Sequence, residues 1–133
     1  MTTMVKSSEL KDSGRPFNEA SAPAKEKNVR ELFHPSVEVA AEALSGNGFT
    51  YRHDWGNRHG QWKLTLNWGA INRNSRVFVS ASEFGGGNQS PFVGAARYTV
   101  HNVAPFDGGV TVWINIEWGA DIRVQLSYLI VNP

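Results

Sequence analysis

Residues 61–68 read QWKLTLNW, and this stretch decides the fold class. Apolar and polar side chains alternate along it, with Trp62, Leu64, Leu66 and Trp68 on one face and Lys63, Thr65 and Asn67 on the other. A period of two is typical of a strand that buries one face and exposes the other. The stretch therefore predicts a half-buried β-strand.

The same alternation recurs on both sides of this stretch. It appears in SRVFVSASEF (75–84), GAARYTVHNV (94–103), GVTVWINIEW (109–118) and DIRVQLSYLIV (121–131), and GFTYRHDW (48–55) is the sixth expected strand. The connectors 56–60, 69–75, 85–91, 105–109 and 119–121 contain Gly, Pro, Asn and Asp, which favour turns. With no helix between the strands, the sequence predicts an all-β, six-stranded antiparallel β-sandwich over residues 46–133.

Residues 1–45 differ in composition from the rest of the chain. They hold seven of the twelve acidic residues but only two of the fifteen aromatics, Phe17 and Phe33. A segment so poor in large apolar side chains buries too little surface to offset its conformational entropy. We therefore expect a flexible N-terminal arm over about residues 1–28, followed by one short helix that begins near Pro35 and ends at Gly46.

The composition excludes several classes of protein. The 133 residues contain no cysteine, which removes disulfides, thiolate nucleophiles and zinc–thiolate sites. A formal net charge of +1 argues against binding nucleic acid or an anionic membrane through charge alone. No apolar run is long enough to span a bilayer, and the N-terminus has no apolar core of a signal peptide. We expect no membrane insertion and a cytoplasmic or particle-associated location.

Some outward-facing positions of the predicted strands are apolar. Phe78, Trp113 and Leu129 fall on those faces, which is more apolar surface than a small soluble monomer usually exposes. The sequence therefore predicts a homo-oligomer, a trimer or hexamer, whose interface covers these side chains. The alternative is a two-layer monomer in which they are scattered on the surface.

Catalytic and metal-binding signals are weak. Nucleophile-elbow, zinc-protease and phosphate-loop motifs are absent, so we predict a protein that is not an enzyme and needs no cofactor. A small hydrolase or isomerase that uses carboxylates such as Glu83 and Asp121 is a further alternative. His53, Asp54 and His59 could approach a metal, but we interpret the histidines as exposed loop residues.

Basic and aromatic side chains are interleaved between residues 52 and 76, as in single-stranded nucleic-acid grooves. Trp62 and Trp68 share a face with two leucines, which favours a core position, and the body carries only a small positive charge.

Carbohydrate binding needs aromatic faces together with Arg, Asp, Asn or His on a rigid scaffold, and the body is rich in both.

The segments RVFVSASEF, GAARYTVHNVAPFDGGVTVWINIEW and DIRVQLSYLIV, within residues 76–131, resemble the H-type lectin domain of discoidins and snail agglutinins. The resemblance implies a six-stranded antiparallel sandwich that forms trimers or pairs of trimers and binds sugars of the N-acetylgalactosamine type between subunits. By position, Arg97 is similar to the family's sugar-bonding arginine and Trp118 to the tryptophan that packs on the sugar. Where snail-type members have a histidine after that tryptophan, this chain has Gly119, followed two residues later by Asp121.

The leading hypothesis is a lectin-like oligomeric module that recognises glycans. Its candidate carbohydrate-binding residues are Arg97, Trp118, Asp121 and His101. The alternative role for Trp118 is packing in the core or at an interface. The alternative role for Arg97 is a solvated or intersubunit ion pair. The alternative function is a structural or attachment subunit of a phage, virion or other large particle, in which the interfaces are themselves the function.

Overall fold

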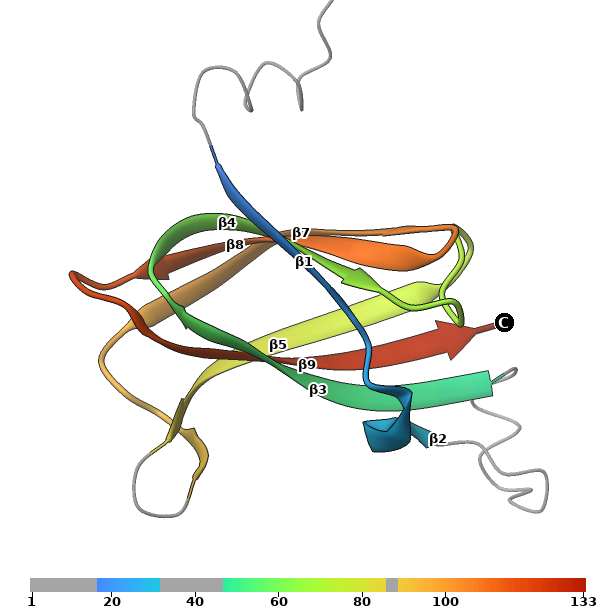
Figure 1. The fold of residues 1–133 in the computed structure, drawn as a ribbon, viewed down its shortest axis with the longest axis horizontal. Coiled ribbons are helices and arrows are strands. Elements are labelled where there is room, and N and C mark those ends of the chain that lie inside the picture. The colour runs from blue at the N-terminus through green and yellow to red at the C-terminus, as the bar shows by residue number, and fades with distance from the viewer. Residues whose placement is uncertain (1–16, 32–46, 86–88) are drawn as a thin grey trace, which may run out of the picture.

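The computed structural model describes residues 17–31, 47–85 and 89–133, and within them the chain is a β-sandwich (Figure 1). The strands are β1 (Asn18–Pro23), β2 (Arg30–Glu31), β3 (Asn47–Arg58), β4 (Gly60–Asn67), β5 (Arg76–Gly85), β6 (Ser90–Phe92), β7 (Arg97–Phe106), β8 (Gly109–Glu117) and β9 (Ile122–Asn132). One 3-10 turn, η2 (Glu26–Asn28), lies between β1 and β2. The all-β class predicted from the alternation is confirmed. The helix expected near Pro35 lies outside the described residues.

The strands form two sheets, with the order β1-β4-β8-β7 in one and β2-β3-β9-β5-β6 in the other. Figure 1 shows the four-stranded sheet above and the five-stranded sheet below it. The six strands expected from the sequence correspond to β3, β4, β5, β7, β8 and β9. They pair with one another in antiparallel fashion wherever they are neighbours.

Residues 18–28, which were expected to belong to a flexible arm, and residues 29–31 after them connect both sheets. β1 pairs with β4 in parallel register over six positions, from Asn18 opposite Trp62 to Pro23 opposite Asn67. β2 then pairs with β3 at the edge of the other sheet. The small side chains of Ala20 and Ala22 pack against the core, so this segment binds by backbone pairing and close approach rather than by large apolar residues.

The core lies between the two inner faces. Leu64, Leu66, Val112, Ile114 and Leu126 have no exposed surface, and all five occupy positions that the alternation assigned to the inward face. Trp68 is also buried, as expected. At roughly 25 cal/mol per Å² of apolar surface removed from water, this continuous layer is the main source of the fold's stability.

Four polar side chains interrupt this core along β3 and β9. Trp55 Nε1 donates to Tyr128 Oη at 3.0 Å, and Tyr51 Oη lies 2.6 Å from His53 Nδ1. The backbone N–H of Lys25 donates to Tyr51 Oη at 3.1 Å. The expectation that His53 is an exposed loop residue is therefore wrong. It lies on β3, it is 7% exposed, and the alternation of side chains along this strand places it on the inward face.

The outward apolar residues differ in exposure. The side chain of Phe78 on β5 is open to solvent, whereas Leu129 and Trp113 are only partly exposed. Trp113 packs between Phe17, at 5.0 Å between ring centroids, and His101, at 4.2 Å. Residues of the N-terminal segment and of β7 thus cover part of the surface that was expected to need a partner subunit.

Candidate functional site

The outer face of the five-stranded sheet carries three rows of side chains that run across β3, β9 and β5. The rows are Thr50–Leu129–Phe78, Arg52–Ser127–Ser80 and Asp54–Gln125–Ser82. Each row joins residues that are direct partners in the register, so their side chains stand next to one another on one face. The face therefore changes from apolar at one end to hydroxyl-rich and charged along its length.

A hollow of about 560 Å³ lies over the first two rows. Asn28 and Arg30, from the segment that pairs with the edge of β3, also line it. Arg52 Nε donates to Ser127 Oγ at 3.3 Å across its floor, and Phe78 is 59% exposed within it. A volume of this size falls within the range of small-molecule sites.

A second hollow of about 380 Å³ shares Asn28, Tyr51 and Arg52 with the first. It extends along β3 to Asp54 and to Phe84 and Gln125 on the neighbouring strands. Gln125 is 8% exposed, and its Oε1 accepts no hydrogen bond from the part of the chain that the structure describes. A buried acceptor without a donor costs free energy, so a hydroxyl or N–H group bound in this hollow would be stabilised by it. We call the two hollows together the β3 groove.

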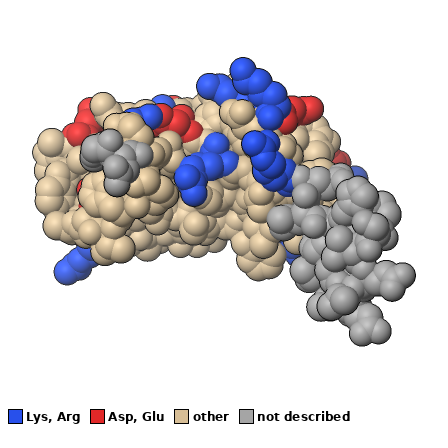
Figure 2. All heavy atoms as spheres, turned by 90° about the horizontal axis from the view of Figure 1, so that it is seen from below, with Lys and Arg blue, Asp and Glu red and all other residues tan. Residues whose placement is uncertain are grey.

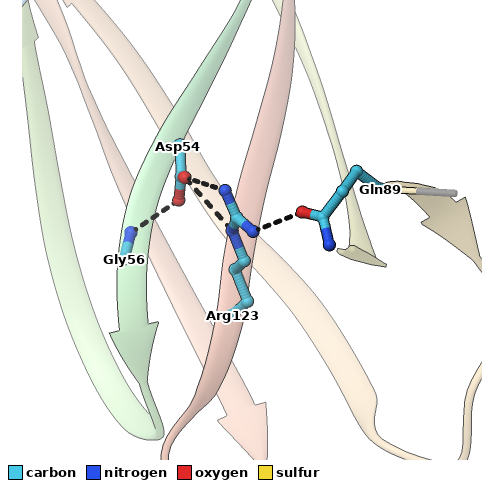
Figure 3. Close-up of polar contacts among 4 residues, drawn as sticks. All are labelled: Asp54, Gly56, Gln89 and Arg123. Atoms are coloured by element: carbon cyan, nitrogen blue, oxygen red, sulfur yellow. Dashed lines mark hydrogen bonds and ion pairs between the residues drawn. The ribbon is translucent and has the colours of Figure 1, made fainter. Parts of the chain in front are cut away.

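Asp54, in the lining of the second hollow, forms an ion pair with Arg123 (Figure 3). Arg123 donates to Asp54 Oδ2 through Nε at 3.1 Å and Nη2 at 2.7 Å, and its Nη1 donates to Gln89 Oε1 at 2.9 Å. The β-bulge at residues 54–56 aims Asp54 here, since Gly56 has the left-handed φ of 78° and its N–H donates to Asp54 Oδ1 at 2.9 Å. The guanidinium also lies 4.9 Å from the ring centroid of Phe84.

These contacts keep Asp54 charged and occupied. Burial alone would raise the pKa of Asp54, but the hydrogen bonds from Arg123 and Gly56 and the nearby positive charge lower it below its ordinary value. Its carboxylate is thus a fixed wall of the groove that positions Arg123, rather than a free proton donor.

The remaining charge of the groove is basic. Figure 2, the view from below the five-stranded sheet, shows Lys and Arg side chains gathered near the middle of this face. Arg30 and Arg52 line the larger hollow, and no Asp or Glu is among the described residues of its lining. Unlike Arg123, neither forms an ion pair with a carboxylate of the described residues.

The residues proposed from the resemblance lie elsewhere. Arg97 is opposite Glu117 in the β7–β8 register, and Trp118, 45% exposed, directly follows β8. Asp121 lies just before β9, where its carboxylate contacts Nδ1 of His59 in the β3–β4 turn. These three residues are at one end of the sandwich, whereas His101 lies further along β7 and stacks on Trp113. None of the four lines either hollow of the β3 groove.

The alternative catalytic and metal residues do not form a common site in the described ranges. His53 points into the core, Asp54 pairs with Arg123 on the outer face, and His59 contacts Asp121. Glu83 lies where β5 pairs with β6. Burial of Tyr98, and then the charge of Glu83, raise the pKa of Tyr98 to about 12. Across residues 17–31, 47–85 and 89–133, no three His, Cys, Asp or Glu side chains gather as a metal site requires.

Several groove residues differ from their expected roles. The sequence predicts Phe78 and Leu129 at a subunit interface, and Arg52 falls in the basic and aromatic stretch that resembles a nucleic-acid groove. The strand alternation places Phe78, Ser80 and Ser127 on outward faces, so parity alone could have grouped the rows. It could not supply Asn28 and Arg30, because nothing in the local sequence indicates that this segment pairs with β3.

Comparisons with known proteins leave the site to be interpreted from its own geometry. No family model, no curated protein and no solved structure matched the chain. Within the described part of the chain, no helix has the length and apolarity to cross a membrane.

Proposed function

We propose that the protein is a non-enzymatic carbohydrate-binding module that holds an oligosaccharide along the β3 groove. The observation that carries this proposal is the exposed ring of Phe78 beside a row of hydrogen-bonding groups from Arg52, Ser127 and Ser80. Sugars present an apolar C–H face and a rim of hydroxyls, and this combination of groups complements both.

The length of the groove favours an oligosaccharide over a monosaccharide. Its two hollows, of about 560 and 380 Å³, share Asn28, Tyr51 and Arg52 in their linings. Neighbouring rows of one sheet face are about 7 Å apart, so three rows extend further than one pyranose ring. At the second hollow, the unpartnered Oε1 of Gln125 can accept a hydrogen bond from a sugar hydroxyl.

Rigid support favours binding without a large rearrangement. The floor of the groove is made of three paired strands, and the Asp54–Arg123–Gln89 contacts brace one end. Preorganised donors and acceptors lose less entropy on binding than flexible ones. The oligomer expected from the sequence and the sugar class implied by the resemblance remain predictions.

The test is a glycan array with the full-length protein and its Phe78→Ala variant. Loss of the aromatic platform should weaken binding to every recognised glycan by about tenfold or more, as expected for a central contact worth at least about 1.4 kcal/mol. Phe78 is exposed, so the variant should unfold at the same urea concentration as the parent.

Trp118→Ala is the matched control, because Trp118 is also an exposed aromatic but lies at the end of the sandwich. We expect it to retain parental binding. Binding lost in Trp118→Ala and kept in Phe78→Ala would move the site to the residues suggested by the lectin resemblance. No binding to any glycan would refute the proposed function.

A further inference from the structure

We infer that the oligosaccharide bound by the β3 groove is anionic, carrying carboxylate or sulfate groups. This inference rests on the proposed function and specifies its ligand class. Among the described residues, the larger hollow is lined by two guanidinium groups, from Arg30 and Arg52, and by no carboxylate. A neutral sugar does not need two uncompensated cations, whereas an acidic sugar is attracted by them.

The hydrogen-bonding state of Arg52 leaves it able to bind an acid group. Its one described hydrogen bond runs from Nε to Ser127 Oγ at 3.3 Å, which fixes the side chain over the floor of the groove. The terminal nitrogens Nη1 and Nη2 form no hydrogen bond to another described residue. A guanidinium whose terminal N–H groups have no partner can form the planar two-donor contact that suits a carboxylate or sulfate.

Arg30 lies on the edge strand β2, opposite Thr50 of β3 in the register. Its described contact is a 3.3 Å hydrogen bond from Nη1 to the backbone oxygen of Val29, a neutral acceptor. Arg30 and Arg52 differ in this respect from Arg123 and Arg73. Arg123 pairs with Asp54, and Arg73 pairs with Asp107. Arg58, Arg76 and Arg97 also have no ion pair among the described residues, but of these arginines only Arg30 and Arg52 line the larger hollow.

The carboxylate in the described lining of the second hollow does not cancel their charge. Asp54 lines the second hollow, but it lies 2.7 Å from Arg123 Nη2 and also accepts the N–H of Gly56. The second hollow additionally contains Lys25. The groove therefore remains positive along its length.

The lining favours an acidic saccharide over nucleic acid. Successive bases need several stacking rings, whereas Phe78 is the single aromatic side chain exposed on the floor of the larger hollow among the described residues. Thr50, Ser80 and Ser127 instead supply hydroxyls, which match the hydroxyls of a sugar.

The experiment measures binding of the full-length protein to matched saccharide pairs. The probes are sulfated, uronate and sialylated oligosaccharides, each beside its desulfated, methyl-esterified or desialylated counterpart, together with a single-stranded oligonucleotide. We expect the acidic member of a pair to bind about tenfold more tightly, with the difference shrinking as sodium chloride is raised. In Arg52→Gln and in Arg30→Gln the preference should fall to within about threefold.

Arg97→Gln is the control, because it removes the same charge from an exposed position on the other sheet. It should keep the preference for acidic members. Equal binding of neutral and acidic members, or a preference that survives both groove variants, would overturn the inference and leave the proposed function intact. Tighter binding of the oligonucleotide than of any saccharide would overturn the inference in favour of nucleic acid, and no saccharide binding would overturn both proposals.

Discussion

At the scale of single residues, the molecule places hydrogen-bonded polar groups inside an apolar core. Tyr51, His53, Trp55 and Tyr128 lie on the inward faces of β3 and β9, each less than 8% exposed. Their partners are one another or the Lys25 backbone, so the cluster joins the strands below the groove to the N-terminal segment that forms its wall. A satisfied buried network stabilises one arrangement, and the loss of one partner is costly.

The Tyr128 hydroxyl provides one test of this network. Tyr128→Phe leaves the buried Trp55 Nε1–H without an acceptor and should lower the free energy of unfolding by about 1–3 kcal/mol, measured by urea denaturation. Tyr98→Phe is the control, since its hydroxyl is only partly buried and donates to the Arg123 backbone oxygen. Equal midpoints for Tyr128→Phe and the parent would contradict the role of this hydrogen bond.

His53 makes the stability depend on pH. Burial, and then the charge of Lys25, lower the pKa of His53 below its ordinary 6.5, with an opposing effect from Asp54. Well above pH 6.5 the imidazole is neutral in both states and adds no pH dependence. Below it, the unfolded chain binds a proton that the folded chain resists, so stability should fall as the pH drops from 6.5 toward the lower folded-state pKa.

The effect of His53 on stability occurs at a higher pH than the effect of Asp54. The pKa of Asp54 is lowered from 3.8, so its contribution is complete above that pH and is lost only below it. Urea unfolding between pH 7 and pH 5 should therefore show a steeper loss in the parent than in His53→Gln. The same slope in both proteins would show that the buried histidine does not titrate in this way.

At the scale of elements, the N-terminal segment is part of the sandwich. β1 adds a parallel strand to β4, and η2 and β2 carry Asn28 and Arg30 to the groove. Ala22 packs against the core, whereas its neighbour Ser21 is exposed. Substitutions at these two positions therefore test whether the segment is a docked strand or a free arm.

Ala22→Asp should lower the free energy of unfolding by about 1–3 kcal/mol because it places a carboxylate against apolar side chains. Ser21→Asp should change it by no more than about 0.5 kcal/mol. Urea denaturation of the two variants gives the comparison. Equal, small effects would mean that this segment contributes nothing to the stability of the sandwich.

The long strands could be predicted because each carries its own evidence. QWKLTLNW and GVTVWINIEW alternate so regularly that the buried positions Leu64 and Ile114 follow from parity. NEASAP in β1 and the two-residue β2 have no such pattern, and they are strands only because β4 and β3 offer unpaired edges. For the same reason, only part of the groove could be predicted. The residues of its floor follow from the alternation along each strand, but its wall depends on pairing between segments that are distant in the sequence.

At the scale of the whole molecule, the surface around Phe78 has two interpretations, a subunit interface or a ligand site. The proposed function assigns it to the ligand. Light scattering should then give the same molar mass for the parent and for Phe78→Ala, whatever the oligomer. A fall in mass in the variant would assign Phe78 to an interface, and growth of the parent into large assemblies with concentration would favour the structural subunit.

The central claim is that saccharide binds on the outer face of β3, β9 and β5. The most direct measurement is an amide NMR titration of the isotope-labelled protein with an oligosaccharide selected by the array. We predict that the largest shifts occur at Arg52, Ser80 and Ser127, whose register places them in one row beneath the groove. Shifts concentrated at Arg97, Trp118 and Asp121, with these three amides unchanged, would contradict the account.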